Sequence, residues 1–140
     1  MFRIRKIHDT VLPVNQEAVR QVQEILRQQF PLLQAGEVDG LPARLRDPLG
    51  HGCRTVVLVA ENGRGCVQGF ALVALFSTPP FCYLDMLSAG PRLEGRGLGG
   101  ALYRRVREET ASAGAIGLFF ECLPDDPALC RDPDLRAQNA

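Results

Sequence analysis

The stretch Glu94-Gly95-Arg96-Gly97-Leu98-Gly99-Gly100-Ala101-Leu102 opens a predicted helix over residues 97–113, whose apolar residues recur at three- and four-residue spacing. Glycine costs a helix about 1 kcal/mol per residue relative to alanine, and packing alone rarely accounts for four glycines at one helix start. Without side chains there, the first N–H groups of the helix can face a ligand, and the helix dipole adds positive potential. The stretch therefore predicts an anion site, most naturally for a phosphate or diphosphate, to which Arg96 adds a charge-assisted contact.

Other interpretations of the same glycines remain open. A tight strand-to-helix connection with close packing of the helix on the sheet would also use small residues. A P-loop is excluded because the stretch contains no lysine. The spacing Gly95-x-Gly97-x-x-Gly100 matches a dinucleotide fingerprint, but that fingerprint belongs to the first unit of an all-parallel sheet and here it stands late in the chain.

Hydrophobic patterns around this stretch predict alternating strands and helices. Strands are expected at residues 2–7, 54–60, 66–76, 81–89 and 115–123, and helices at 14–30, 41–45 and 97–113. The strand–helix–strand unit at the end requires a right-handed crossover, so its two strands are parallel in an otherwise antiparallel sheet. The predicted class is α+β with a mixed, mainly antiparallel sheet.

Several local signals refine these elements. Asn15 is expected to cap the helix at 14–30, with Glu17 in its first turn. An Asn62-Gly63 turn is expected to join the strands at 54–60 and 66–76 into a hairpin. Residues 31–52 outside the short helix are interpreted as loop, and Arg44 and Arg46 as solvated surface residues in preference to contacts with an anionic substrate.

Charge and hydropathy argue against two classes of partner. Sixteen basic and sixteen acidic residues give a formal net charge of zero, which argues against duplex nucleic acid or an anionic membrane surface. Residues 1–6 alternate apolar and basic residues and are not expected to form a secretory start, and the most apolar stretch, residues 70–87, contains Pro79-Pro80 and Asp85. That stretch is therefore not interpreted as a transmembrane helix.

Five cysteines at irregular spacing, without a Cys-x-x-Cys pair, indicate a reduced, cytoplasmic protein. Cys66, Cys82 and Cys122 lie in apolar runs, as small core residues do. No metal is expected, because His51 and Cys53 lack the ligand spacing of a zinc site.

The segment from Ser88 to Leu102 resembles the acetyl-CoA loop of the GNAT superfamily of N-acetyltransferases. That loop reads Arg or Gln, two residues, Gly, any residue, then Gly or Ala, a few residues after a strand and a proline. Gly97 and Gly99 match the small positions and Pro91 the proline, whereas Glu94 stands where Arg or Gln is usual. The order of elements also resembles the family, so we expect a GNAT-like domain over residues 1–123 and a polar tail over 124–140.

The resemblance implies an acyl-CoA N-acyltransferase fold with helices on both faces of the sheet, and acetyl-CoA (coenzyme A) as the acyl donor. A small-molecule or peptide amine would attack the thioester directly in a ternary complex. Main-chain groups of Leu87, Ser88 and Ala89 would hold the pantetheine and polarise the thioester carbonyl. The pyrophosphate would bind to the backbone amides of Gly95, Arg96, Gly97, Leu98, Gly99 and Gly100.

The resemblance also implies a base that accepts the proton of the amine. Asp85 and Glu121 lie in strands where the family often has an acidic residue. Both stand among apolar neighbours, so each carboxylate is alternatively paired with an arginine or a backbone amide. Tyr83 shares a strand face with Asp85 by alternation. It is interpreted either as a residue that orients a substrate or as part of the core.

The chain departs from the family after the last expected strand. The family continues with a helix, whose tyrosine commonly protonates the leaving thiolate, and further strands. Here Gln138-Asn139-Ala140 resembles the start of that segment, and no tyrosine follows Tyr103. We therefore expect a GNAT domain without its C-terminal helix and strands, with an open sheet edge suited to a homodimer or a further domain. The alternative function is a non-catalytic CoA- or acyl-CoA-binding or interaction module of a larger protein.

Overall fold

The computed structural model describes residues 2–30, 35–47, 52–89 and 97–121. Its five strands form one sheet in the order β1-β2-β3-β4-β5. They span Arg3–Ile7, Arg54–Glu61, Val67–Ser77, Pro80–Ser88 and Leu118–Phe119. The first four pair antiparallel and β5 pairs parallel with β4, which confirms the predicted mixed sheet and its crossover.

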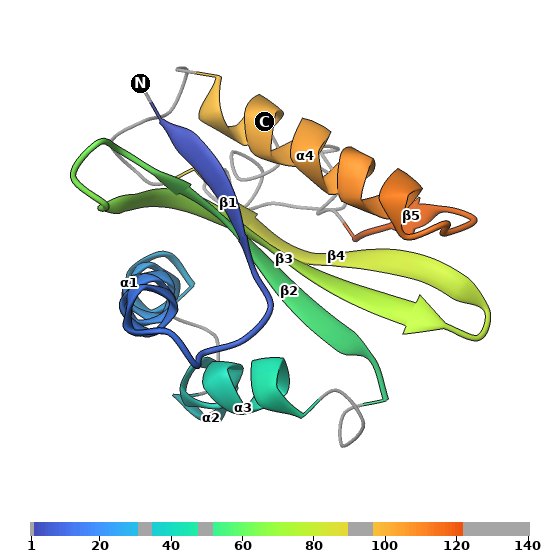
Figure 1. Ribbon diagram of the computed structural model, residues 1–140, viewed down its shortest axis with the longest axis horizontal. Coiled ribbons are helices and arrows are strands. Elements are labelled where there is room, and N and C mark those ends of the chain that lie inside the picture. Colours follow the sequence, from blue (N-terminus) through green and yellow to red (C-terminus); the bar gives the residue numbers. More distant parts are fainter. Residues whose placement is uncertain (1, 31–34, 48–51, 90–96, 122–140) are drawn as a thin grey trace, which may run out of the picture.

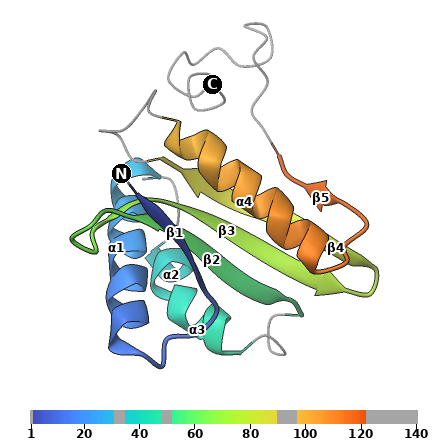
Figure 2. The ribbon, with the colours of Figure 1, turned by 45° about the horizontal axis from the view of Figure 1, so that its top comes forward.

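Helices cover both faces of this sheet, as expected. One face carries α1 (Pro13–Gln29), α2 (Ala35–Asp39) and α3 (Leu41–Arg46), and the other carries α4 (Leu98–Ser112) (Figure 1). Because side chains alternate along a strand, β2 contributes Val57 and Val59 to the first core and Val56 and Leu58 to the second. Figure 2 shows α4 lying across its face of the sheet, with β5 beside it.

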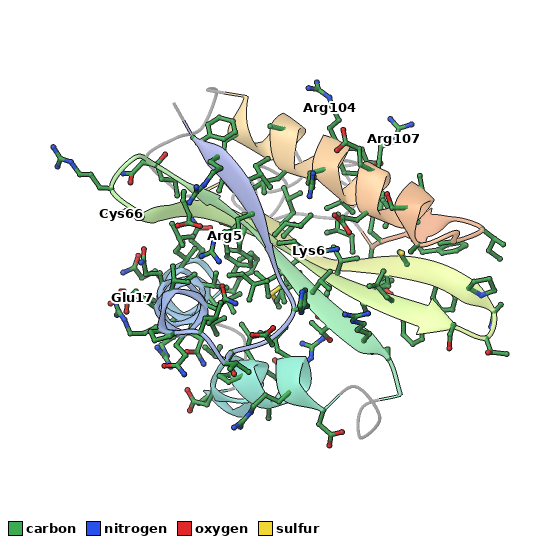
Figure 3. All side chains as sticks on the ribbon, in the orientation of Figure 1. Arg5, Lys6, Glu17, Cys66, Arg104 and Arg107 are labelled. Carbon is green, nitrogen blue, oxygen red and sulfur yellow. The ribbon has the colours of Figure 1, made fainter. Side chains whose placement is uncertain are left out.

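The start of α1 differs from the prediction. Leu12 is the N-cap and Pro13 the first helical residue, where the fixed φ of proline suits a helix start. Asn15 therefore does not cap the helix: it lies inside, 8% exposed, and its side chain accepts a hydrogen bond from Arg5, which extends from β1 toward α1 (Figure 3). Glu17 correspondingly lies beyond the first turn. The predicted apolar face is confirmed, with Ala18, Val19, Val22 and Leu26 buried.

The region between α1 and β2 contains more helix than predicted. The short helix α3 confirms the expectation at 41–45 and buries Leu41 and Leu45, one turn apart. The interpretation of residues 35–39 as loop is wrong, because they form α2. This helix buries one residue, Val38, so the sequence contains no apolar repeat that could reveal it.

The hairpin of β2 and β3 is confirmed, but its turn is of another kind. The residue with positive φ is Gly65, at 77°, and not the predicted Gly63. The Asn62 side chain accepts bonds from the N–H groups of Arg64 and Cys66, and the Gly65 N–H donates to the Asn62 carbonyl. Asn62 thus organises a longer loop with its side chain.

The cysteines divide between surface and core. Cys66 is exposed in the hairpin loop (Figure 3), so its expected place in the core is wrong. Cys82 is fully buried on β4, as predicted, and Cys122 lies outside the described residues. In the part of the chain that the structure describes, no group of metal-ligating side chains could hold a metal ion.

The strand expected at 115–123 is wrong at residues 115–117 and 120–121, and residues 122 and 123 lie outside the described residues. Within the described residues β5 comprises Leu118–Phe119 alone, and residues 115–117 lead into it as irregular backbone. The Ile116 N–H donates to the Pro80 carbonyl, and the Cys82 N–H donates to the Gly117 carbonyl. No helix among the described residues is long and apolar enough to cross a membrane.

Candidate functional site

The predicted anion site lies at the start of α4. Gly97 is the N-cap with φ 76°, a left-handed conformation that favours glycine, and no side chain caps the helix. The first amide bonded back along the chain is that of Ala101, to the Gly97 carbonyl at 3.0 Å. Among the described residues no group accepts a hydrogen bond from the amides of Leu98, Gly99 or Gly100. These three donors and the positive end of the helix dipole face the same place.

Packing does not explain the two glycines inside the first turn. Among the described residues, a Cβ at Gly100 would have no atom within 4 Å, and one at Gly99 would make only ordinary contacts of 3.8 and 3.9 Å with Ala89 and Leu87. Alanine would fit at either position and would suit the helix better by up to about 1 kcal/mol. The tight-connection interpretation is therefore unsupported at Gly99 and Gly100.

Close packing instead requires a glycine that sequence reasoning missed. A Cβ on Gly69 of β3 would lie 2.6 Å from the Ser88 carbonyl oxygen and 3.1 Å from both Ala89 Cα and Leu98 Cδ2. This glycine lets the end of β4 and the start of α4 approach each other. A glycine inside a predicted strand is the signal that could have revealed it.

The end of β4 lies beside the start of α4. Leu87 and Ala89 point toward Gly99, and the Ser88 hydroxyl donates to the Gln29 side chain of α1 on the opposite face. In the described part of the chain β5 pairs with β4 only at Cys82 and Tyr83, so it does not accompany β4 as far as these three residues. The three predicted pantetheine residues are thus brought next to the predicted phosphate donors, whereas Gly95 and Arg96 lie outside the described residues.

A β-bulge interrupts the pairing of β4 with β3 at Asp85. Leu84 pairs with Val73 and Met86 with Leu72, so Asp85 is the extra residue on β4. Bulges redirect side chains and often lie near active sites. Leu84 packs in the core under α4, and Met86 packs in the core under α1. Residues two apart in an unbroken strand would share a face, so the extra residue explains this difference.

Asp85 forms an ion pair with Arg44 of α3. Both guanidinium Nη atoms of Arg44 lie 3.4 Å from Asp85 Oδ2, and the two side chains are 29% and 32% exposed. The interpretation of Arg44 as a solvated surface residue is therefore wrong, and the alternative of an arginine partner for Asp85 is realised. This ion pair could not be predicted from sequence, because strand alternation does not show where α3 lies relative to β4.

Glu121 follows the short strand β5. Phe119 pairs with Tyr83 in parallel register, and Glu121 stands two residues beyond that pair. Partial burial raises the pKa of Tyr83, and the negative charges of Glu121 and then Asp85 raise this pKa further. The phenol therefore lies within the field of both carboxylates.

Aromatic rings gather at the paired ends of β3, β4 and β5. Phe81 stacks on Phe76 with ring centroids 4.4 Å apart and meets the Phe119 ring edge-on at 5.7 Å. By alternation Phe81 and Tyr83 share one face of β4, opposite to Cys82 and Leu84. Sequence reasoning missed this group, since it depends on the short parallel pairing of β4 with β5.

Solved structures share this fold. Tetrahymena GCN5 has a TM-score of 0.72 at 13% identity, covering 84% of this chain and 69% of its own. The aminoglycoside acetyltransferase AAC(6')-Iy, in complex with a CoA-containing bisubstrate analogue, has a TM-score of 0.68 at 16% identity, with 91% and 84% covered. A ribosomal-protein-alanine N-acetyltransferase from Brucella melitensis has a TM-score of 0.64 at 13% identity, with 86% and 80% covered. At these identities the likeness concerns the fold.

Sequence comparison identifies the family. No curated protein sequence matches the chain significantly. The family model described as "Acetyltransferase (GNAT) family" matches residues 19–131, which is more than half of the chain. That match includes the glycine-rich start of α4, the end of β4, and both carboxylates of the neighbouring site. The chain belongs to the GNAT family of acetyltransferases.

Proposed function

We propose that this chain transfers the acetyl group of acetyl-CoA to a primary amine by direct attack in a ternary complex. Beyond family membership, one observation carries the proposal: the amides of Leu98, Gly99 and Gly100 adjoin the end of β4, and the same strand carries Asp85 and the phenol of Tyr83, on which Glu121 and Asp85 both act. Acetyl-CoA would supply a thioester whose acetyl group is transferred to the amine. Residues of this chain would bind both substrates and accept the proton of the amine.

The donor-binding residues fit a long ligand with a diphosphate. The amides of Gly97, Leu98, Gly99 and Gly100, with those of Gly95 and Arg96, would bind the diphosphate at the helix start. Main-chain groups of Leu87, Ser88 and Ala89 would hold the pantetheine along β4. A fixed N–H beside the thioester oxygen would lower the barrier to attack by roughly 3 kcal/mol.

Two carboxylates are available to accept the proton of the amine. Arg44 engages Asp85 Oδ2, whereas Glu121 is exposed and takes part in no ion pair among the described residues. Glu121 is accordingly proposed as the general base, with Asp85 binding the incoming ammonium. Tyr83 lies near both carboxylates and would orient the acceptor between them.

Several finer statements belong to the same proposal. Similar structures are named for an aminoglycoside and for a ribosomal-protein alanine, so a small-molecule and a peptide amine both suit this fold. The domain boundary at residue 123, a cytoplasmic location and the pairing of the sheet edge with another chain stay predictions.

Replacing each carboxylate by its amide tests the assignment. We expect Glu121→Gln to lower kcat by roughly 10²- to 10⁴-fold, as the loss of a general base does. Asp85→Asn should mainly raise KM for the amine, and both variants should bind acetyl-CoA normally. Thiol release from acetyl-CoA with a panel of amines measures the first two quantities, and calorimetry the third. The matched control is Glu37→Gln on the exposed side of α2.

Two results would contradict different parts of the proposal. A full kcat in Glu121→Gln would remove Glu121 as base but leave the transferase. Tight acetyl-CoA binding by the parent chain with no thiol release for any amine would favour the non-catalytic CoA-binding module.

A further inference from the structure

The candidate acceptor site, formed by Tyr83, Asp85, Glu121 and Arg44, combines two carboxylates with one guanidinium group. Arg44 reaches from α3 to the β4 bulge and places both Nη atoms 3.4 Å from Asp85 Oδ2. Glu121 stands two residues beyond Phe119, the partner of Tyr83, and its charge acts on the Tyr83 phenol together with that of Asp85. Two carboxylates and one guanidinium leave a net charge of about −1, enough to balance a single ammonium group.

The Arg44–Asp85 pair is suited to exchange. Its two hydrogen bonds are long, and both side chains are about one-third exposed. Pairs of this kind contribute little to stability, so an incoming group can replace either partner at small cost. The position of α3 does not depend on the pair, because buried Leu41 and Leu45 anchor the helix in the core.

An incoming acceptor meets the two partners differently. Its ammonium group would compete with Arg44 for Asp85, whereas an anionic group would compete with Asp85 for Arg44. A guanidinium presents a planar fork of donors that matches a carboxylate or a phosphate. A second ammonium on the acceptor would be repelled by Arg44 at short range.

We propose that Arg44 is a specificity-determining residue that selects acceptors with an anionic group near the reacting amine and disfavours polycationic amines. The acceptor class is thus an amino acid, an acidic peptide, or a small molecule of the same charge pattern. This inference rests on the proposed acetyl transfer and narrows its acceptor. The inference also disfavours aminoglycosides, which are polycationic amines and after which some structurally similar enzymes are named.

Two matched series of probes test the inference. One contains four-carbon amines that differ only in the far group: 1,4-diaminobutane, butylamine and 4-aminobutanoate. The other contains the amidated tripeptides Ala-Lys-Ala, Ala-Gln-Ala and Ala-Glu-Ala. For each member kcat/KM is measured by thiol release with the parent chain, Arg44→Gln, Arg44→Lys and the control Arg46→Gln. Arg46 is an exposed arginine of the same helix that makes no ion pair to Asp85 in the described residues.

The parent chain should prefer the anionic member of at least one series over the cationic member by tenfold or more. Arg44→Gln should reduce this ratio at least tenfold or invert it, Arg44→Lys should retain part of it, and Arg46→Gln should keep it within twofold. Calorimetry should find acetyl-CoA binding equal in all four proteins, which separates a changed acceptor site from a damaged fold.

Turnover with an unchanged ratio in Arg44→Gln would overturn this inference and leave the acetyl transfer intact. So would a parent chain that prefers the cationic members. A parent chain that binds acetyl-CoA but acetylates no member of either series would overturn the inference together with the transferase.

Discussion

At the residue scale, Gly99 and Gly100 lie where the described part of the protein leaves room for a side chain. Neither has a positive φ, and a Cβ would meet only ordinary contacts with described residues at Gly99 and none at Gly100. Alanine would stabilise the helix, so the glycines are best explained by a ligand that approaches the backbone. Gly97 differs, because its left-handed conformation accounts for it without a ligand.

A bulky side chain at Gly99 should therefore affect the ligand more than the fold. We expect Gly99→Val to weaken acetyl-CoA binding at least tenfold in calorimetry, because the side chain would enter the space beside Leu87 and Ala89. The matched control is Gly63→Val in the exposed hairpin loop, where a Cβ has nothing within 4 Å. Both variants should melt within roughly 3 °C of the parent, which corresponds to about 1 kcal/mol for a chain of this size. Unchanged binding in Gly99→Val would contradict the assignment of the loop.

Tyr83 reports on the two carboxylates directly. Its pKa should lie above the ordinary tyrosine value, because partial burial and the charges of Glu121 and Asp85 disfavour the phenolate. Ultraviolet titration of the Tyr103→Phe variant isolates Tyr83, since the chain has two tyrosines. Glu121→Gln should lower the pKa of Tyr83 more than Asp85→Asn does. If Glu121→Gln leaves that pKa unchanged, Glu121 lies farther from the phenol than the proposed site requires.

At the scale of elements, the sheet and α4 follow from sequence patterns, whereas their irregularities do not. Long apolar runs predicted β2, β3 and β4, and the glycine stretch predicted the start of α4. The bulge at Asp85 escaped prediction, because one extra residue in a strand leaves no separate mark on an apolar run. It nevertheless shapes the site, since the change of phase after Asp85 puts Met86 in the core under α1 and directs Leu87 and Ala89 toward Gly99.

Gly69 couples β3 to the end of β4 and the start of α4. A methyl group there would lie 2.6 Å from the Ser88 carbonyl oxygen, a backbone atom that cannot move alone. We expect Gly69→Ala to lower the free energy of unfolding by about 1–3 kcal/mol, as overpacking does. Acetyl-CoA binding should weaken as well, because Ser88, Ala89 and Leu98 would shift together.

Chemical denaturation measures the first effect and calorimetry the second. Gly63→Ala serves as the control, because its Cβ would have nothing within 4 Å. A Gly69→Ala protein as stable as the parent would refute the close approach of β3, β4 and α4.

At the scale of the molecule, the fold brings together groups that are distant in the chain. The donor-binding stretch could be predicted from sequence, because its residues are neighbours around one strand-to-helix connection. The acceptor site could be predicted only as separate carboxylates, since Arg44, Asp85 and Glu121 come from α3, β4 and the chain after β5. Their meeting depends on helix placement and on the short β4–β5 pairing, which local patterns do not encode.

The central claim is that main-chain donors at the start of α4 bind the diphosphate of acetyl-CoA. The most direct test is calorimetric titration of the full chain with acetyl-CoA and, separately, with S-acetylpantetheine, which lacks the diphosphate. We expect one site with a Kd on the order of micromolar for acetyl-CoA, and binding of S-acetylpantetheine weaker by a factor of ten or more. Equal affinities for the two ligands, or no heat from acetyl-CoA at millimolar concentration, would contradict the claim.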